Sequence, residues 1–92
     1  MVTNEMSDAR PKKRSLTLHG HRTSVSLEEP FWRAFLKIAE SEGKTINGLA
    51  AEIDDARLGD PGLASAIRLY VLAHLEARAA LAAATPHLSP EP

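Results

Sequence analysis

The feature that most constrains the fold is one short segment with the alternating pattern of a β-strand. One set of alternate residues is suited to a buried face, and the other set is polar. In residues 21–27, HRTSVSL, one strand face carries Thr23, Val25 and Leu27, and the other carries Arg22, Ser24 and Ser26. A lone strand leaves its backbone N–H and C=O groups unpaired, so it needs a partner strand. The simplest partner is the same strand of a second subunit, related by a two-fold axis. Whether residues 15–18 add to this ribbon stays open.

Two helical segments follow the strand. The first begins near Pro30, because proline suits the first helical position, and it ends at Gly43. The second begins at Thr45, a preferred N-cap residue, and its apolar residues keep helical spacing. Residues 54–59 are expected to form a connection.

A third helical segment covers about residues 61–84. Asp60 and Pro61 provide an N-cap followed by a proline at the first helical position, and an alanine-rich stretch prolongs the helix. Apolar residues on more than one side of it indicate burial against more than one neighbour. The expected fold class is therefore mainly α-helical, with one short N-terminal strand and an extra C-terminal helix.

Length and composition restrict the class of protein. The chain has 92 residues, one domain, and a core of this size gains stability from oligomerisation. The absence of cysteine excludes a disulfide scaffold, a thiolate metal site and a cysteine nucleophile. No apolar run approaches the roughly 18 residues of a membrane span. The basic residues near the N-terminus are not followed by an apolar segment, so we expect no signal peptide. We therefore expect a cytoplasmic protein without cofactors.

The net charge of −1 conceals an asymmetry along the chain. Residues 1–27 carry five Lys or Arg against two carboxylates, whereas residues 28–92 are acidic overall. A basic arm on an acidic body suggests contact with a polyanion, although a solvated tail is an open alternative. The expected organisation is a flexible basic arm at 1–14, a folded domain at 15–84 and a disordered proline-rich tail at 85–92.

The segment HRTSVSLEEPFWRAFLKIAESEGKTINGLAAEI resembles the ribbon-helix-helix DNA-binding proteins, the superfamily that includes the Arc and MetJ repressors. With the following SAIRLYVLAHL, it is similar to a group of short bacterial ribbon-helix-helix proteins. The resemblance covers about residues 15–77. It implies an intertwined homodimer whose two strands form an antiparallel β-ribbon.

The resemblance also implies DNA-contacting positions. In this family the paired strands enter the major groove, which admits a two-stranded ribbon. The matching base-contacting residues are Arg22, Ser24 and Ser26. The N-terminus of the second helix clamps a phosphate in the family, and the matching positions are Lys44, Thr45, Ile46 and Asn47. A basic cluster that could follow the phosphate backbone consists of Lys12, Lys13 and Arg14.

The apolar residues at strand and helix spacing are expected to form a core shared by both subunits. Its members are Val25, Leu27, Phe31, Phe35, Ile38, Leu49 and Ile53. The aromatic residues near Trp32 could be read as a base-stacking platform, but their helical spacing favours the dimer core.

Two other chemistries are disfavoured. His19 and His21 alternate on one strand face, but a metal site needs three or four converging ligands, so no metal is expected. Glu52, Asp54 and Asp55 could be read as a catalytic cluster of carboxylates. The sequence offers no nucleophile or glycine-rich phosphate loop to act with them, so no enzymatic activity is expected.

The function implied is that of a transcriptional regulator, a repressor that binds duplex DNA as a homodimer; pairing of dimers into tetramers stays open. Two features depart from the family pattern. One is the presence of two serines, Ser24 and Ser26, at base-contacting positions, and the other is the long third helix. Two alternatives therefore remain. One is an antitoxin-like autoregulator that binds a toxin through its C-terminal part, and the other is a protein-interaction adapter that has lost DNA binding.

Overall fold

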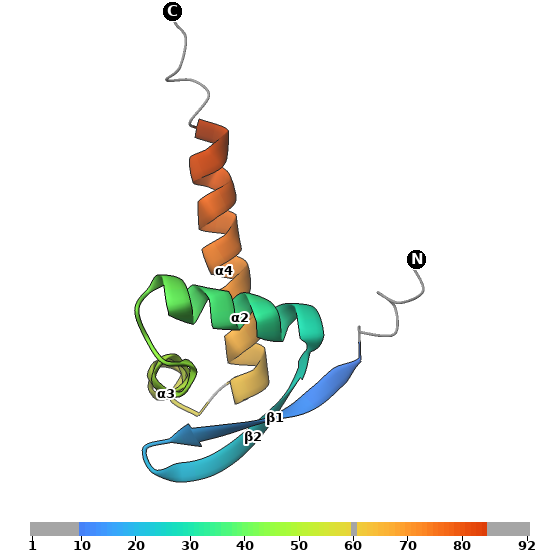
Figure 1. Ribbon diagram of the computed structural model, residues 1–92, viewed down its shortest axis with the longest axis vertical. Coiled ribbons are helices and arrows are strands. Elements are labelled where there is room, and N and C mark those ends of the chain that lie inside the picture. The colour runs from blue at the N-terminus through green and yellow to red at the C-terminus, as the bar shows by residue number, and fades with distance from the viewer. Residues whose placement is uncertain (1–9, 60, 85–92) are drawn as a thin grey trace, which may run out of the picture.

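The computed structural model describes residues 10–59 and 61–84. Its elements, in chain order, are β1 (Pro11–Leu18), β2 (His21–Glu28), α2 (Glu29–Ser41), α3 (Ile46–Arg57) and α4 (Leu63–Ala84). The hairpin lies along one side of the body, α2 and α3 lie above it, and α4 runs from the hairpin past α2 (Figure 1). This mainly helical architecture with a two-stranded antiparallel ribbon confirms the predicted fold class. The expected tail at 85–92 and the first nine residues of the expected arm lie outside the described residues.

The strand finds its partner within the same chain, which corrects the expectation of one strand per subunit. β1 pairs with β2 around a two-residue loop, with Leu18 opposite His21. The loop residues His19 and Gly20 have φ angles of 52° and 80°, and this type of tight hairpin turn needs positive φ at both positions. Residues 11–14, expected in a flexible arm, form the first half of β1. Their sequence, PKKR, does not indicate a strand, because proline and lysine are rare in strands except at the edge of a sheet.

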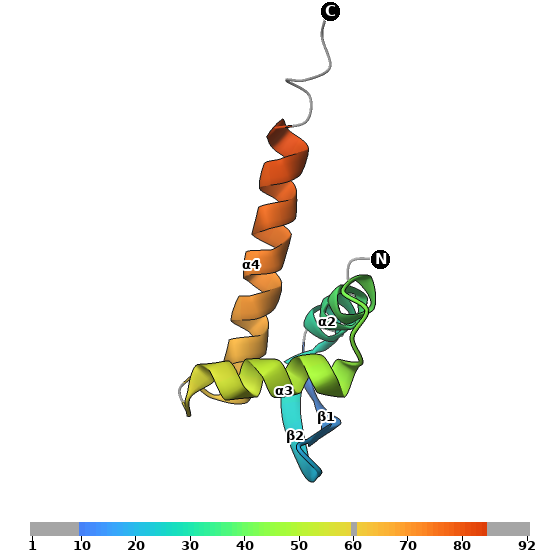
Figure 2. The ribbon, with the colours of Figure 1, turned by 90° about the vertical axis from the view of Figure 1, so that its left-hand side faces the viewer.

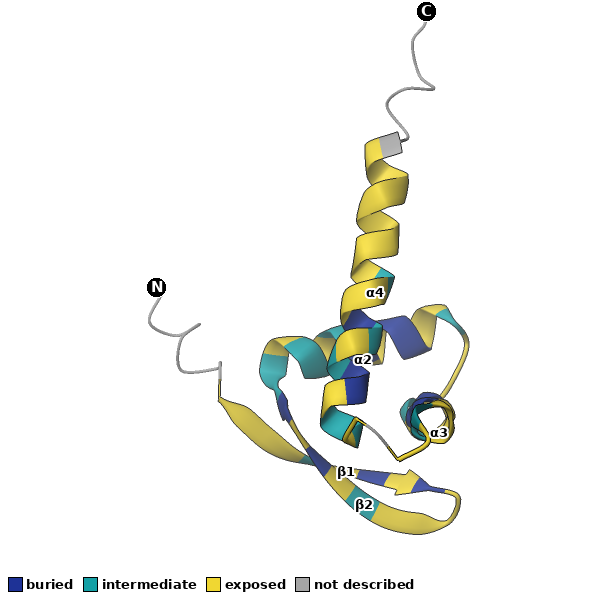
Figure 3. Cartoon of the chain, turned by 180° about the vertical axis from the view of Figure 1, so that it is seen from behind, coloured by how far each residue is buried: buried dark blue, intermediate teal, exposed yellow. Residues whose placement is uncertain are grey.

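The core lies between the inner face of the hairpin and the three helices (Figure 3). Six predicted core residues are buried, and Phe31 is half-buried; the six are Val25, Leu27, Phe35, Ile38, Leu49 and Ile53. The buried residues outside the predicted core set are Leu16, Leu18, Ala39, Ala50, Ala66, Ile67 and Val71. All of these contacts form inside one chain. β1 takes the place that the sequence analysis assigned to the strand of a second subunit, and the first half of α4 covers the core.

The ends of α2 and α3 follow local capping chemistry. After α2, the Lys44 amide donates to the Ala39 carbonyl at 2.9 Å, which closes the helix as predicted. α3 continues to Arg57, so the expected connection at 54–59 is wrong in its first four residues. The Arg57 Nε donates to Asp54 Oδ1 at 2.8 Å one turn earlier, and Leu58 then ends the helix in a left-handed conformation.

α4 begins at Leu63, slightly later than expected, and its two halves differ. Its first half packs on the body through buried residues such as Ile67 and Val71. From residue 75 to residue 83 every side chain is exposed, and the helix projects away from the body (Figure 2). None of the helices in the described ranges combines the length and apolar character needed to cross a membrane.

One ion pair fastens α4 to the end of β2. The Arg68 guanidinium donates to both carboxylate oxygens of Glu28, at 2.9 and 3.1 Å, and to the Ser26 carbonyl at 3.2 Å. It also lies 5.8 Å from the Phe31 ring centroid. These hydrogen bonds hold the pKa of the Glu28 carboxyl below its usual value. The same contact occupies a carbonyl at the outer edge of β2.

Candidate nucleic-acid interface

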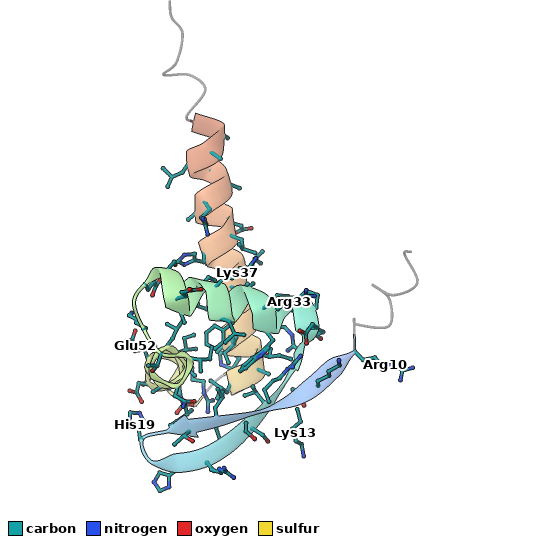
Figure 4. All side chains as sticks on the ribbon, viewed as in Figure 1. Arg10, Lys13, His19, Arg33, Lys37 and Glu52 are labelled. Carbon is teal, nitrogen blue, oxygen red and sulfur yellow. The ribbon has the colours of Figure 1, made fainter. Side chains whose placement is uncertain are left out.

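The side of the hairpin that faces away from the helices carries six polar side chains, which we call the outer face. They stand opposite one another in three cross-strand pairs, Lys13 with Ser26, Ser15 with Ser24, and Thr17 with Arg22. All six residues are exposed. Lys13 points away from the helices (Figure 4). The outer face therefore presents two cations and four hydroxyls, with no carboxylate among them.

This face combines residues that sequence reasoning found with others that it missed. Arg22, Ser24 and Ser26 lie together, as the period of two predicts. Ser15 and Thr17 on β1 were missed because β1 was not predicted as a strand. The signal was present in the sequence, since they alternate with Leu16 and Leu18 just before a residue pair suited to a tight turn.

The basic cluster 12–14 does not act as one group. Arg14 lies on the inner side of the hairpin, because neighbouring strand residues point to opposite faces. Its guanidinium is 2.7 Å from Glu29 Oε1 and 5.3 Å from the Trp32 ring centroid, and its side chain is only 16% exposed. Lys12 shares the inner register but is exposed, so Lys13 is the member of the cluster on the outer face. The expectation that Arg14 contacts phosphate is therefore corrected.

The Arg14 contact has an electrostatic consequence. The hydrogen bond from its guanidinium holds the pKa of the Glu29 carboxyl below its ordinary value, and the charge of Arg33 acts in the same direction. Arg14 thus serves as an internal partner that fastens β1 to the start of α2.

The predicted phosphate-clamp side chains at the start of α3 have partners inside the chain. The Thr45 hydroxyl accepts a hydrogen bond from the Gly48 amide at 2.9 Å, which is ordinary N-capping. A side chain at Gly48 would place its Cβ 2.9 Å from that hydroxyl oxygen, so the glycine makes room for the cap. The Lys44 ammonium lies 2.8 Å from Glu52 and 3.3 Å from Glu42, and these carboxylates raise its pKa.

Asn47 joins the start of α3 to the edge of β1. Its side-chain carbonyl accepts a hydrogen bond from the Thr17 amide at 3.0 Å. This contact occupies an amide at an otherwise open strand edge. It also sets the first turn of α3, with its free backbone amides, beside one end of the outer face.

The turn of the hairpin is held to the end of α3. His19 Nε2 lies 2.9 Å from Asp55 Oδ1, and both side chains are more than half exposed. His21 is exposed beside it. Within the described ranges, no group of three His, Cys, Asp or Glu residues is arranged to hold a metal ion.

Comparison with known families gives a match that follows these boundaries. The model of the ribbon-helix-helix domain matches residues 11–75. The chain belongs to the ribbon-helix-helix domain family. The matched part of this ribbon-helix-helix domain starts at the first residue of β1 and ends at Leu75, where the projecting half of α4 begins. Comparisons with curated proteins and with solved structures found no match.

Membership carries general properties of the family. Ribbon-helix-helix proteins are in general DNA-binding transcription regulators, they typically bind DNA as dimers, and their fold is not an enzymatic one. The outer face of this ribbon-helix-helix domain is the part of the described structure whose chemistry suits such binding.

Proposed function

We propose that this protein is a sequence-specific DNA-binding transcription regulator, acting as a repressor, that inserts the outer face of its hairpin into the major groove. The observation that carries the proposal is the composition of that face, two cations and four hydroxyls on adjacent strands, all exposed. The major groove, about 12 Å wide, admits a two-stranded ribbon and displays a distinct donor and acceptor pattern for each base pair.

The residues of the outer face take different tasks in this proposal. Arg22 can bond the O6 and N7 atoms of guanine with two donors, and this contact supplies most of the discrimination. Ser24 and Ser26 contact base edges beside it, with Ser15 and Thr17 opposite them. Lys13 contributes attraction to phosphate that weakens as the salt concentration rises.

The first turn of α3 supplies a phosphate contact at the flank of the ribbon. Thr45 caps this helix, and Asn47 fixes it to β1, so the backbone amides of residues 46 and 47 are held beside the outer face. Helix N-termini attract anions through such amides and the helix dipole. Lys44 adds little to this contact, because Glu42 and Glu52 already neutralise its charge. Lys12 reaches the backbone from the open end of the hairpin.

A homodimer acting in the bacterial cytoplasm completes the proposal, as is typical of the family. Because one chain here builds the whole two-stranded ribbon, the dimer contacts lie outside the pairing of β1 with β2. Assembly of dimers into tetramers on adjacent DNA sites would extend the same arrangement.

One observation favours a second candidate function, a protein-interaction adapter. α4 leaves large apolar side chains exposed to solvent, among them Leu69, Leu72 and Leu75, which are 58%, 50% and 46% exposed. A contiguous apolar patch on such a surface is typical of a protein-binding site. The continuous helix over Leu63–Ala84 argues against the antitoxin-like alternative, because a toxin-binding segment of that kind is usually disordered before it binds.

Fluorescence anisotropy with DNA from upstream of the protein's own gene tests the proposal. A scrambled duplex is measured beside it over a salt series. We expect tight binding to the upstream DNA, a steep salt dependence, and a loss of at least about tenfold in the Arg22→Ala, Ser24→Ala variant, since one lost bidentate base contact is worth about 1–3 kcal/mol. The matched control is Arg78→Ala on α4, which should bind like the wild type.

One binding result would contradict the proposed role of the outer face. Equal weak binding to both duplexes, unchanged in the double variant, would mean that the outer face does not read DNA. The adapter function would then be the better account.

A further inference from the structure

A second concentration of positive charge lies away from the outer face, in the angle between α2 and α4. A pocket of about 410 Å³ is lined there by Arg33 and Lys37 of α2 and by Arg78 of α4, with Ala34 and Leu75 among its apolar residues. Three cationic side chains from two helices thus surround one hollow. No carboxylate is among the residues that line it.

The charges of this pocket are largely uncompensated. Arg33 Nε lies 3.5 Å from Glu29 Oε2, and the Arg33 side chain is 60% exposed, so this pairing is loose. The other oxygen of Glu29 has the closer partner, Arg14 at 2.7 Å. In the described part of the chain, neither Lys37 nor Arg78 has a carboxylate within ion-pair distance. The pocket therefore attracts anions.

The other residues that line the pocket are apolar. Leu75 is 46% exposed although it sits beside three cationic groups, and Ala34 lines the same hollow from α2. Small-molecule pockets usually have volumes of about 300–1,000 Å³ and combine apolar walls with a few charged groups. This pocket meets both conditions.

We propose that the pocket between α2 and α4 binds a small organic anion, in which a carboxylate, sulfonate or phosphate group is carried on an apolar or aromatic body. The acidic group would lie among Arg33, Lys37 and Arg78, and the apolar body would cover Leu75. A second copy of this chain fits the site poorly, because a symmetric contact would bring six like charges together. Duplex DNA held by the outer face lies on the other side of the body, since Arg33 and Lys37 sit on α2 across from Lys13 (Figure 4).

Titration of the ¹⁵N-labelled full chain, followed by amide chemical shifts, tests this site directly. The probe is 1-naphthoate, and its two partial counterparts are the neutral alcohol 1-naphthalenemethanol and inorganic phosphate. We expect saturable shifts centred on Ala34 and Leu75 with naphthoate. Each counterpart supplies only half of the chemistry, so each should bind about tenfold more weakly, a difference of roughly 1.4 kcal/mol.

Variants separate this site from the DNA-binding face. Arg33→Gln combined with Lys37→Gln removes exposed charges and should weaken naphthoate binding by at least about tenfold, while the dispersed spectrum reports that the fold is intact. Arg22→Gln on the outer face is the matched control and should leave naphthoate binding unchanged.

Several results would overturn the proposal. These are the absence of saturable shifts at millimolar naphthoate, shifts confined to the hairpin, equal affinity for the neutral alcohol, or unchanged binding in the α2 double variant. The experiment contains no DNA, so its failure is distinct from a failure of the proposed function.

Discussion

The two faces of the hairpin share one backbone and differ in nearly everything else. The inner face buries Leu16, Leu18, Val25 and Leu27, none more than 7% exposed. The outer face exposes six polar side chains drawn from the same two strands. Since the strand period is two, a slip of one residue would exchange the faces. The burial of the inner face therefore fixes which residues are presented to a ligand. Substitutions at inward positions test stability, and substitutions at the alternating outward positions test recognition.

The largest effect is expected inside the hairpin. Leu27→Ala removes a side chain that is 0% exposed, and the resulting cavity should lower the free energy of unfolding by about 2–5 kcal/mol. Urea denaturation measures the change. The adjacent outward residue gives the control, Ser26→Ala, which should stay within about 0.5 kcal/mol of the wild type. Equal losses in both variants would contradict the division between the faces.

A smaller effect is expected where the hairpin is fastened to α4. Arg68→Ala removes the paired hydrogen bonds to Glu28 and the bond to the Ser26 carbonyl, and it should cost about 1–3 kcal/mol of unfolding free energy. Arg68→Lys should recover only part of this loss, because an ammonium cannot bond both carboxylate oxygens in the same planar geometry. Arg78→Ala on the same helix is the control, with little change in the urea midpoint. A full recovery by lysine would show that charge alone matters.

Acid should weaken the same attachment. The pKa of Glu28 is lowered in the folded chain by Arg68, below the ordinary value of 4.5. Its contribution is therefore complete above about pH 4.5 and is lost as the pH falls through the folded pKa. The melting temperature should drop across that interval, and Glu28→Gln should make the drop shallower. In the Arg68→Ala background the same substitution should change the slope much less, because only the hydrogen bond from the Glu28 backbone amide then lowers the pKa of this carboxyl; an equally large change would contradict the role of Arg68.

The smallest effect on stability is expected on the outer face. Lys13→Gln with Arg22→Gln should change the unfolding free energy by less than about 0.5 kcal/mol. Under the proposed function, the same variant should reduce the salt slope of DNA binding by about one, for the lost phosphate contact of Lys13, and it should relax base discrimination through the loss of Arg22. Thermal melting and anisotropy on one protein preparation give both numbers. A large loss of stability would show that the outer face also supports the fold.

The sequence predicts the helices and β2 because both rest on local periodicity. Arg22, Ser24 and Ser26 alternate with inward residues, and Thr45 occupies the N-cap that its residue type favours. In the second half of β1, Ser15 and Thr17 alternate with Leu16 and Leu18, which is a local signal of a strand. The first half of β1, residues 11–14, has no such alternation, so its pairing with β2 could not be predicted from local pattern.

The role of Arg14 was predicted wrongly for a related reason. Three consecutive basic residues look equivalent in sequence, but strand geometry sends Lys13 outward and Arg14 inward, toward Glu29 fifteen residues away. The pocket between α2 and α4 also escaped prediction. Arg33 and Arg78 are far apart along the chain, and only the packing of the two helices brings them to one hollow.

Under the proposed function, the pairing of β1 with β2 inside one chain has a consequence for the kind of DNA sequence that the hairpin recognises. A ribbon built from two copies of one strand is symmetric, and it matches a palindromic site. This hairpin instead sets Lys13, Ser15 and Thr17 against Ser26, Ser24 and Arg22, so its two halves are chemically different. A single hairpin would therefore read a sequence with a direction. Any palindrome in the target would arise from the placement of two whole hairpins, and the spacing between half-sites would report the distance between them.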